Sequence, residues 1–288
     1  MARPQINQKN PLMQYMRQPK IYISLPSQGK YWSPGSINIP ENGQLPVYSM
    51  TAKDELMFKT PDALMSGQAV VDVIQSCVPN ILNAWACPSI DLDMILVAIR
   101  IATYGDKMTV SYNIPNTPEE GEYEINLHGF IDQISQAQWI EQVPLNDGLI
   151  VFVKPLTYKH MSTISQKSFE TSKIMQIASD NSLTEAQKAA YIADSFKTLT
   201  DLTTDMLASS IFKIKTADQD VTEARFIREF IENADKSLSD TIQKHINDLK
   251  DQNEIKPLTV STTPEQQEMG APETFEVPVS FDNSTFFG

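Results

Sequence analysis

The sequence feature that most constrains the fold is the stretch Asp91–Tyr112, which reads DLDMILVAIRIATYGDKMTVSY. Its first part, up to Tyr104, places apolar side chains around most of a helical circumference, and only Asp91, Asp93 and Arg100 are charged. A helix that is apolar nearly all round lies in a core or spans a membrane, and a span needs about 20 apolar residues. This run ends too soon, so we predict the central core helix of a soluble domain.

Size and charge limit the classes of partner. The 288 residues are enough for one or two domains, each with a real core. The net charge of −13 disfavours general binding to nucleic acid or to anionic membranes, because both surfaces are negative. No apolar run is long enough to span a bilayer, and residues 1–20 lack the apolar region of a signal peptide. We therefore expect neither a nucleic-acid nor a membrane partner.

The part of the chain before residue 156 predicts short strands around the core helix. Residues 1–19 are expected to be a flexible arm, and residues 20–155 an α+β domain of short antiparallel strands. Thr51 and Asp54 resemble a capping box that starts a short helix. The expected strands are Ile21–Leu25, Val47–Met50, the hairpin Met108–Ile114 with Glu122–Leu127, Trp139–Val143 and Leu149–Val153.

After Pro155 the sequence changes to helical periodicity. Residues 156–252 are predicted to be all-helical, an elongated hairpin or small bundle whose apolar stripes need a partner. Residues 253–288 are poor in apolar residues and carry four prolines, so they are expected to be a disordered tail. The expected helices are 157–180, 184–199, 201–213, 220–233 and 237–251.

Two groups of aromatic residues are candidates for partner binding. The turn LPSQGKYW presents Tyr31 and Trp32, and the acidic tail ends in a series of phenylalanines, which is typical of a docking peptide. The alternatives are core packing for the first pair and an inert tail for the second group. The tail candidates are Phe275, Phe281, Phe286 and Phe287.

No constellation of catalytic, cofactor-binding or metal-binding residues emerges from the sequence. His128, His160 and His245 lie far apart in different expected elements, and Cys77 and Cys87 are too few for a zinc site and are expected to be buried free thiols. Asp91 and Asp93 suit the positive end of a helix dipole better than a metal or acid–base pair. We therefore predict a non-enzymatic protein without cofactor or metal; the rival is a hydrolase that uses an unrecognised carboxylate pair.

Four ordered blocks of sequence resemble a known family. They are LPSQGKYW, VYSMTAKDELMFKTPDALMSG, VIQSCVPNI and DLDMILVAIRIATYG, and together they cover about residues 20 to 155. The chain resembles the T-even-type phage baseplate protein family, which includes the hub assembly protein of contractile tails. Relatives often carry a cysteine pair in the hairpin after the central helix, but the matching SYNIPNTPEEGEYEI here has none. The resemblance therefore does not extend to a metal site in this chain.

The resemblance implies a phage tail protein that is made in the host cytoplasm and has no enzymatic activity. Its expected partners are baseplate hub and tape-measure proteins, which the helical region and the aromatic tail would bind during assembly. The mostly polar surface favours this assembly role over the alternative, a permanent structural subunit of the virion baseplate. Self-association is left open.

Overall fold

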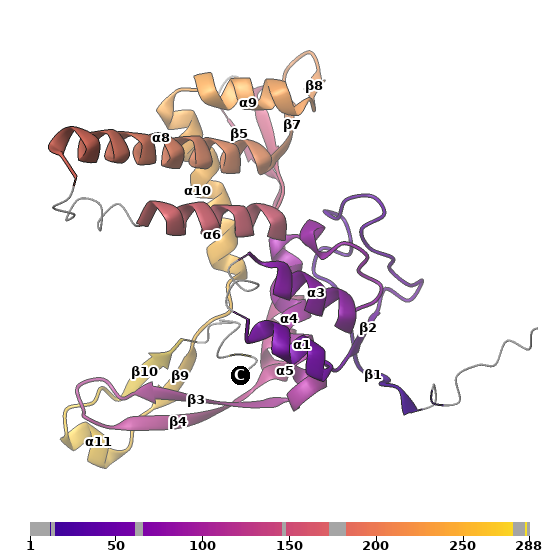
Figure 1. Cartoon of the computed structure of the whole chain (residues 1–288), viewed down its shortest axis with the longest axis vertical. Helices are drawn as coiled ribbons and strands as arrows, with labels where there is room; N and C mark the ends of the chain where they lie inside the picture. The colour runs from indigo at the N-terminus through magenta and orange to yellow at the C-terminus, as the bar shows by residue number, and fades with distance from the viewer. Residues whose placement is uncertain are drawn as a thin grey trace, which may run out of the picture.

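The computed structural model describes residue 12, residues 15–60, 66–145, 148–172 and 183–278, and residue 286. Three hydrophobic cores organise these residues. The largest core surrounds the central helix, the second lies beneath a four-stranded sheet, and the third holds a small β lobe together. In Figure 1 the first lies in the middle, the second at the top and the third at the bottom.

The central helix is confirmed as α4 (Ser89–Tyr104), with Met94, Ile95, Val97 and Ile99 all but fully buried. Its apolar circumference is covered from several sides by helices and by one two-stranded antiparallel sheet. These elements are β1 (Pro19–Ile23), β2 (Leu45–Tyr48), α1 (Ala52–Phe58), α3 (Gln68–Cys77), η2 (Ala84–Ala86) and α5 (Leu127–Ser135).

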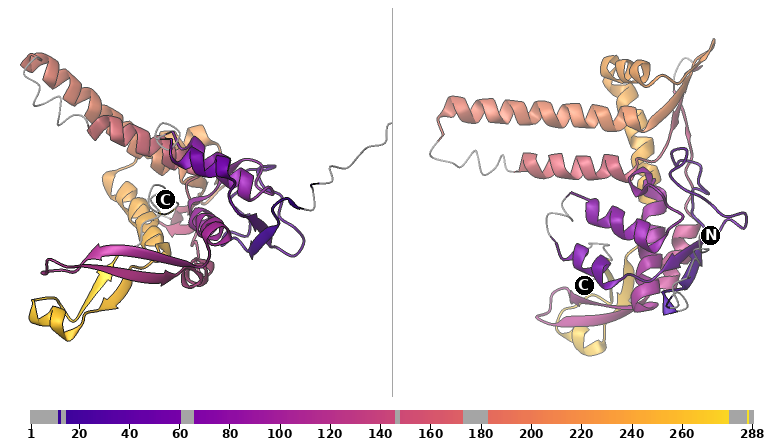
Figure 2. Two further views of the ribbon diagram at one scale, coloured as in Figure 1. Left: turned by 60° about the horizontal axis from the view of Figure 1, so that its bottom comes forward. Right: turned by 45° about the vertical axis from the view of Figure 1, so that its right-hand side comes forward.

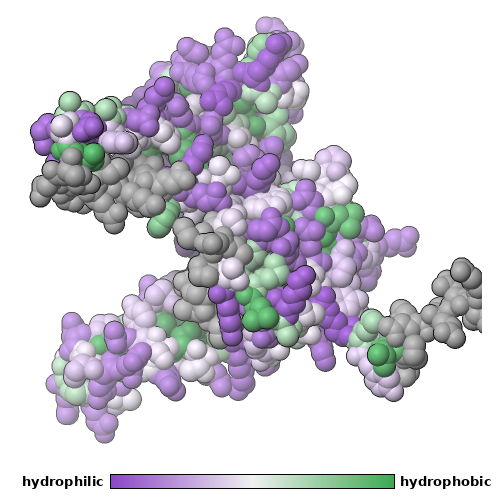
Figure 3. Space-filling model, viewed as in Figure 1, coloured by the Kyte–Doolittle hydropathy of each residue, from purple (hydrophilic) through white to green (hydrophobic). Residues whose placement is uncertain are grey.

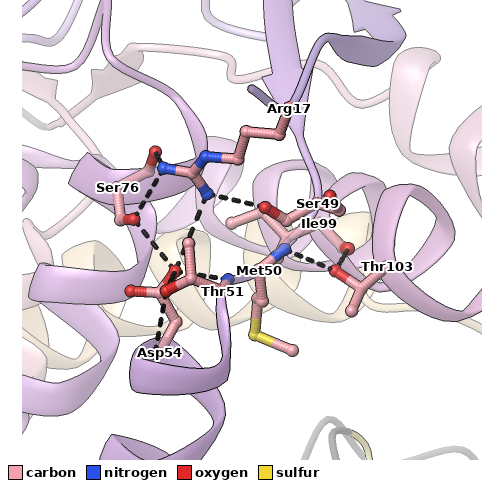
Figure 4. Close-up of polar contacts among 8 residues, drawn as sticks. All are labelled: Arg17, Ser49, Met50, Thr51, Asp54, Ser76, Ile99 and Thr103. Atoms are coloured by element: carbon pink, nitrogen blue, oxygen red, sulfur yellow. Dashed lines mark hydrogen bonds and ion pairs between the residues drawn. The ribbon is translucent and has the colours of Figure 1, made fainter. Parts of the chain in front are cut away.

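The start of α1 is fastened to its neighbours by polar contacts (Figure 4). The predicted capping box is present: Thr51 and Asp54 each accept a hydrogen bond from the other's backbone N–H. Arg17 donates to the carbonyl oxygens of Ser49 and Ser76, both at 2.6 Å, and lies 3.7 Å from the Asp54 carboxylate. Arg17, at the end of the N-terminal segment that was expected to be flexible, thus connects this segment to α1 and α3.

The second core corrects the prediction of an all-helical region. A four-stranded antiparallel sheet has the order β5-β6-β7-β8, and two helices pack on it. Two of its strands fall within residues 156–252, so the all-helical prediction is wrong, and the sheet also crosses the division expected at residue 155. The elements are β5 (Gln142–Pro144), β6 (Ile150–Val153), β7 (Ile211–Lys215), β8 (Asp220–Val221), α9 (Ala224–Asn233) and α10 (Lys236–Asn253).

Between β6 and β7 the chain forms a protruding helical hairpin. Helix α6 (Tyr158–Ser172) and helix α8 (Glu185–Ser209) run side by side away from the body, as Figures 1 and 2 show. We call this hairpin the arm. The elongated hairpin expected from the sequence is therefore present, but the helices expected at 184–199 and 201–213 form one continuous helix that ends at Ser209.

The third core corrects the prediction of a disordered tail. Strands β9 and β10 pair in antiparallel register, with Phe275 opposite Val260, and pack against the predicted hairpin of β3 and β4. The tail prediction is therefore wrong for residues 258–277, which together with 107–126 form what we call the β lobe. Its elements are β3 (Lys107–Asn113), β4 (Glu120–Asn126), β9 (Leu258–Ser261), α11 (Pro264–Glu268) and β10 (Thr274–Val277).

The fold is thus a mixture of helices and small antiparallel sheets, as the predicted α+β class requires. Within the residues described, every helix is too short or too polar to cross a membrane.

Candidate partner-binding surfaces

The turn that carries Tyr31 and Trp32 is held against the central helix by a buried carboxylate. Asp91 is fully buried, and it accepts hydrogen bonds from the backbone N–H of Ser27 at 2.8 Å, from the Ser27 hydroxyl, and from Trp32 Nε1 at 2.8 Å. Burial raises the pKa of Asp91, although the three donors act in the opposite direction. Asp91 therefore fixes residues 27–32 as a rigid part of the main core.

The two aromatic residues of this turn have different surroundings. Trp32 is buried, as the core-packing alternative required. Tyr31 is half-buried and donates its hydroxyl to Glu141 at 3.0 Å, while Lys30 forms an ion pair with the same carboxylate at 2.7 Å. Burial, with Glu141 beside the phenol, raises the pKa of Tyr31 well above its usual value. Partner binding by either residue stays a prediction.

The structure buries the tail aromatics that it describes. Phe275 packs in the β lobe against Tyr112 and Tyr123, with ring centroids 6.1 and 5.9 Å apart. Phe286 returns to the main core, is 1% exposed and lies 5.9 Å from the guanidinium of Arg100. Phe281 and Phe287 lie outside the described residues. Both placed side chains contact this chain itself, and docking through the tail stays a prediction.

The arm exposes several large aromatic side chains. From residue 185 to residue 201 no side chain of α8 is buried, and the first buried position is Leu202 near the body. Phe169, Tyr191 and Phe196 are 51%, 52% and 64% exposed. The helical periodicity of the sequence predicted apolar stripes that need a partner. It did not predict which aromatic side chains would be exposed.

At the base of the arm lies a groove of about 560 Å³ between α6, α8, α9 and η2. Its floor is apolar, with Trp85, Ile164 and Met206, and Trp85 stacks on Tyr158 at a centroid distance of 5.6 Å. Its rim is mainly cationic, and the one carboxylate in it, Asp205, is paired with Arg228 at 2.5 Å. The cationic residues that line it are Lys159, Lys167 and Arg228.

The cysteines and two of the histidines have structural surroundings. Within the described part of the chain, no three His, Cys, Asp or Glu side chains are grouped closely enough to hold a metal ion. Both cysteines are free and buried, and burial raises the pKa of Cys77 to about 12. His160 accepts from or donates to Thr157 at 2.7 Å, while His245 contacts the carbonyl oxygen of Ile140 at 2.9 Å.

The sequence matches the family described as "T4 bacteriophage base plate protein" over residues 19–263. This chain belongs to that family. The match extends well beyond residues 20–155, on which the resemblance was based, and includes the arm, the second core and part of the β lobe. No curated protein and no solved structure shows significant similarity to the chain.

Membership of the T4 base plate protein family gives the arm and the groove a context. The family associates the protein with a structural role in a phage tail baseplate. In such a role, surfaces that contact other proteins are the functional sites. The exposed aromatic side chains of the arm and the groove at its base are candidate surfaces of this base plate protein for such contacts.

One half-buried acid gives this base plate protein a testable pH dependence. Burial, with Glu254 nearby, raises the pKa of Asp93 to about 6 from a usual value of 3.8. The folded state then binds the proton of Asp93 more tightly than the unfolded state does. The contribution of this group to stability is therefore greatest at low pH and is lost as the pH rises through about 6. Asp93→Asn should increase the free energy of unfolding at pH 8 by about 1–3 kcal/mol, measured by urea denaturation.

The gain should shrink as the pH falls from 6 and should vanish well below 3.8, because the carboxyl group is then neutral in both states. Asp240→Asn, at an exposed position of α10, serves as the control and should change the free energy of unfolding by less than about 0.5 kcal/mol. Equal stability of Asp93→Asn and the parent protein at pH 8 would contradict the prediction.

Proposed function

We propose that this protein acts without enzymatic activity in the assembly of the baseplate hub, by binding hub or tape-measure proteins in the host cytoplasm. One observation carries the proposal: the outer part of α8, residues 185–201, has no buried side chain. On this part of α8, Phe196 is exposed beside the half-buried Ile192 and Leu199, which follow helical spacing, and Tyr191 is exposed next to that face. An apolar helical face of this kind is suited to a further helix from a partner.

Two observations support the non-enzymatic part of the proposal: the family, and the structural hydrogen bonds that Asp91 accepts. The carboxylate that the hydrolase alternative needs is fully buried and accepts three hydrogen bonds from residues 27 and 32. A carboxylate engaged in this way stabilises a turn and has no access to a substrate.

The arm is tested by the double variant Tyr191→Ser, Phe196→Ser. Both side chains are more than half exposed, so the free energy of unfolding should change by less than about 1 kcal/mol. Removal of two aromatic anchors should weaken binding of co-expressed hub or tape-measure proteins at least about tenfold, measured by affinity purification and quantitative mass spectrometry.

Phe226→Ser is the matched control, because Phe226 on α9 is also exposed, at 44%, but lies outside the arm. The control should retain the partners at parental levels. If the arm variant also retains them in full, the arm is not the binding surface and the proposal fails.

The alternative is a permanent structural subunit of the virion baseplate, which the family description favours. Mass spectrometry of purified virions beside infected-cell lysate separates the two roles. A fixed stoichiometry in virions after washing in high salt identifies a permanent subunit, whereas abundance in the lysate together with absence from virions identifies an assembly factor.

A further inference from the structure

The charge of this protein is distributed unevenly between the β lobe and the base of the arm. The β lobe carries eight glutamates and one lysine, and all eight glutamates are exposed. Only one of them, Glu124, forms an ion pair among the described residues, with Lys107 at 2.7 Å. Figure 3 shows the lobe at the lower left as a largely hydrophilic projection. The glutamates are Glu119, Glu120, Glu122, Glu124, Glu265, Glu268, Glu273 and Glu276.

The groove at the base of the arm has the opposite charge. Residues 157–169, at the start of α6, contain no acid and include two lysines that line the groove, Lys159 and Lys167; Glu170 follows three residues after Lys167. Lys159 is exposed, and Arg228 is paired with Asp205 in the groove and with Glu232 on α9. In a chain with a net charge of −13, this groove is a local site of positive charge with an apolar floor.

We propose that copies of this protein associate head to tail, with the glutamate face of the β lobe of one copy bound in the cationic groove of the next. The occupant is a second copy because this chain itself presents the complementary surface, a hairpin with exposed carboxylates. Glu120 and Glu122 alternate along one face of β4 and point away from the side that β9 and β10 cover.

The β lobe lies at the bottom of Figure 1, whereas α6, α8 and α9, which line the groove, lie in its upper half. Contact between them therefore joins different copies. A contact between two different surfaces leaves one of each unused, so it produces a closed ring or an extended chain rather than a two-fold dimer. The proposal is independent of partner capture by the outer part of the arm.

Sedimentation velocity of the full chain over a range of concentrations tests the proposal. Association should be present at about 0.1 M salt and largely lost at about 1 M salt, because the Debye length falls from about 10 Å to about 3 Å. Lys159→Glu, Lys167→Glu in the groove, or Glu120→Lys, Glu122→Lys in the lobe, should each weaken association at least about tenfold.

The combination of all four substitutions gives the sharpest result. Each pair alone places like charges opposite one another, whereas the four together exchange the charges at the substituted positions and restore attraction there, so association should return. Lys236→Glu, Lys244→Glu on α10 makes the same charge change at two exposed positions outside the groove and should associate like the parent. Thermal unfolding of each variant establishes that it is folded.

A chain that stays monomeric at low salt would overturn the proposal, and so would association that the groove variant leaves unchanged. If the parent is monomeric but binds a synthetic peptide of residues 117–126, the groove takes an acidic segment from another protein and the second-copy assignment is wrong. Histidine NMR provides a local readout of the bound state. The neighbouring Lys154 and Lys159, together with burial, lower the pKa of His160, and a bound carboxylate should raise it.

Discussion

Replacing Asp91 with alanine is expected to lower the free energy of unfolding by about 3–5 kcal/mol. The substitution removes the acceptor of the Ser27 N–H, the Ser27 hydroxyl and the Trp32 indole N–H, and all of these groups lie in the buried interior. A buried donor left without a partner costs about 1–3 kcal/mol. Chemical denaturation followed by tryptophan fluorescence measures the loss.

Asp91→Asn separates the role of the charge from that of the hydrogen bonds. The amide keeps one acceptor oxygen and the shape of the side chain, so we expect a loss of about 1–3 kcal/mol, smaller than that for alanine. Asp106→Ala, at an exposed position just after α4, is the control and should be nearly neutral. Full stability of Asp91→Ala would show that the turn at residues 27–32 is held by other contacts.

The second large effect is expected at Phe286, close to the end of the chain. Phe286→Ala should destabilise the protein by about 3–5 kcal/mol, because the ring is 1% exposed and its removal leaves a cavity in the main core. Phe286→Leu retains most of the apolar volume and should cost less than about 1.5 kcal/mol. Thermal and urea unfolding of both variants measure the difference.

This result also decides between two roles of the tail. A large loss of stability makes Phe286 a core residue, as its burial indicates. If Phe286→Ala has parental stability and binds hub proteins less well, the ring leaves the core to dock on a partner, and the sequence-based hypothesis of an aromatic docking tail is supported for this residue.

The elements that the sequence predicted correctly carry local signals. The apolar circumference of α4, the capping box of Thr51 and Asp54, and the alternation of β3 and β4 can each be recognised within one short window. The features that were missed depend on residues far apart in the chain. Ile211–Lys215 is a strand because it pairs with β6, which precedes the arm, and a five-residue run gives no separate indication.

The same reason applies to the tail and to Asp91. Residues 258–277 are poor in apolar residues, but Phe275 and Val277 find their contacts on β3 and β4, which lie far earlier in the sequence. Asp91 was interpreted as a residue that complements the helix dipole, because its partners Ser27 and Trp32 are 64 and 59 residues away. Only the folded structure brings these groups together.

The position of the arm within the sheet has a consequence for how such proteins diversify. Val153 of β6 and Ile211 of β7 are paired across one antiparallel ladder, so the chain leaves the sheet and re-enters it at neighbouring points about 5 Å apart. Adding or removing a helical turn in both α6 and α8 would change the reach of the hairpin by about 5.4 Å without rebuilding the body. The length of the hairpin can therefore change, to fit a neighbouring protein of a different size, while the rest of the fold stays the same.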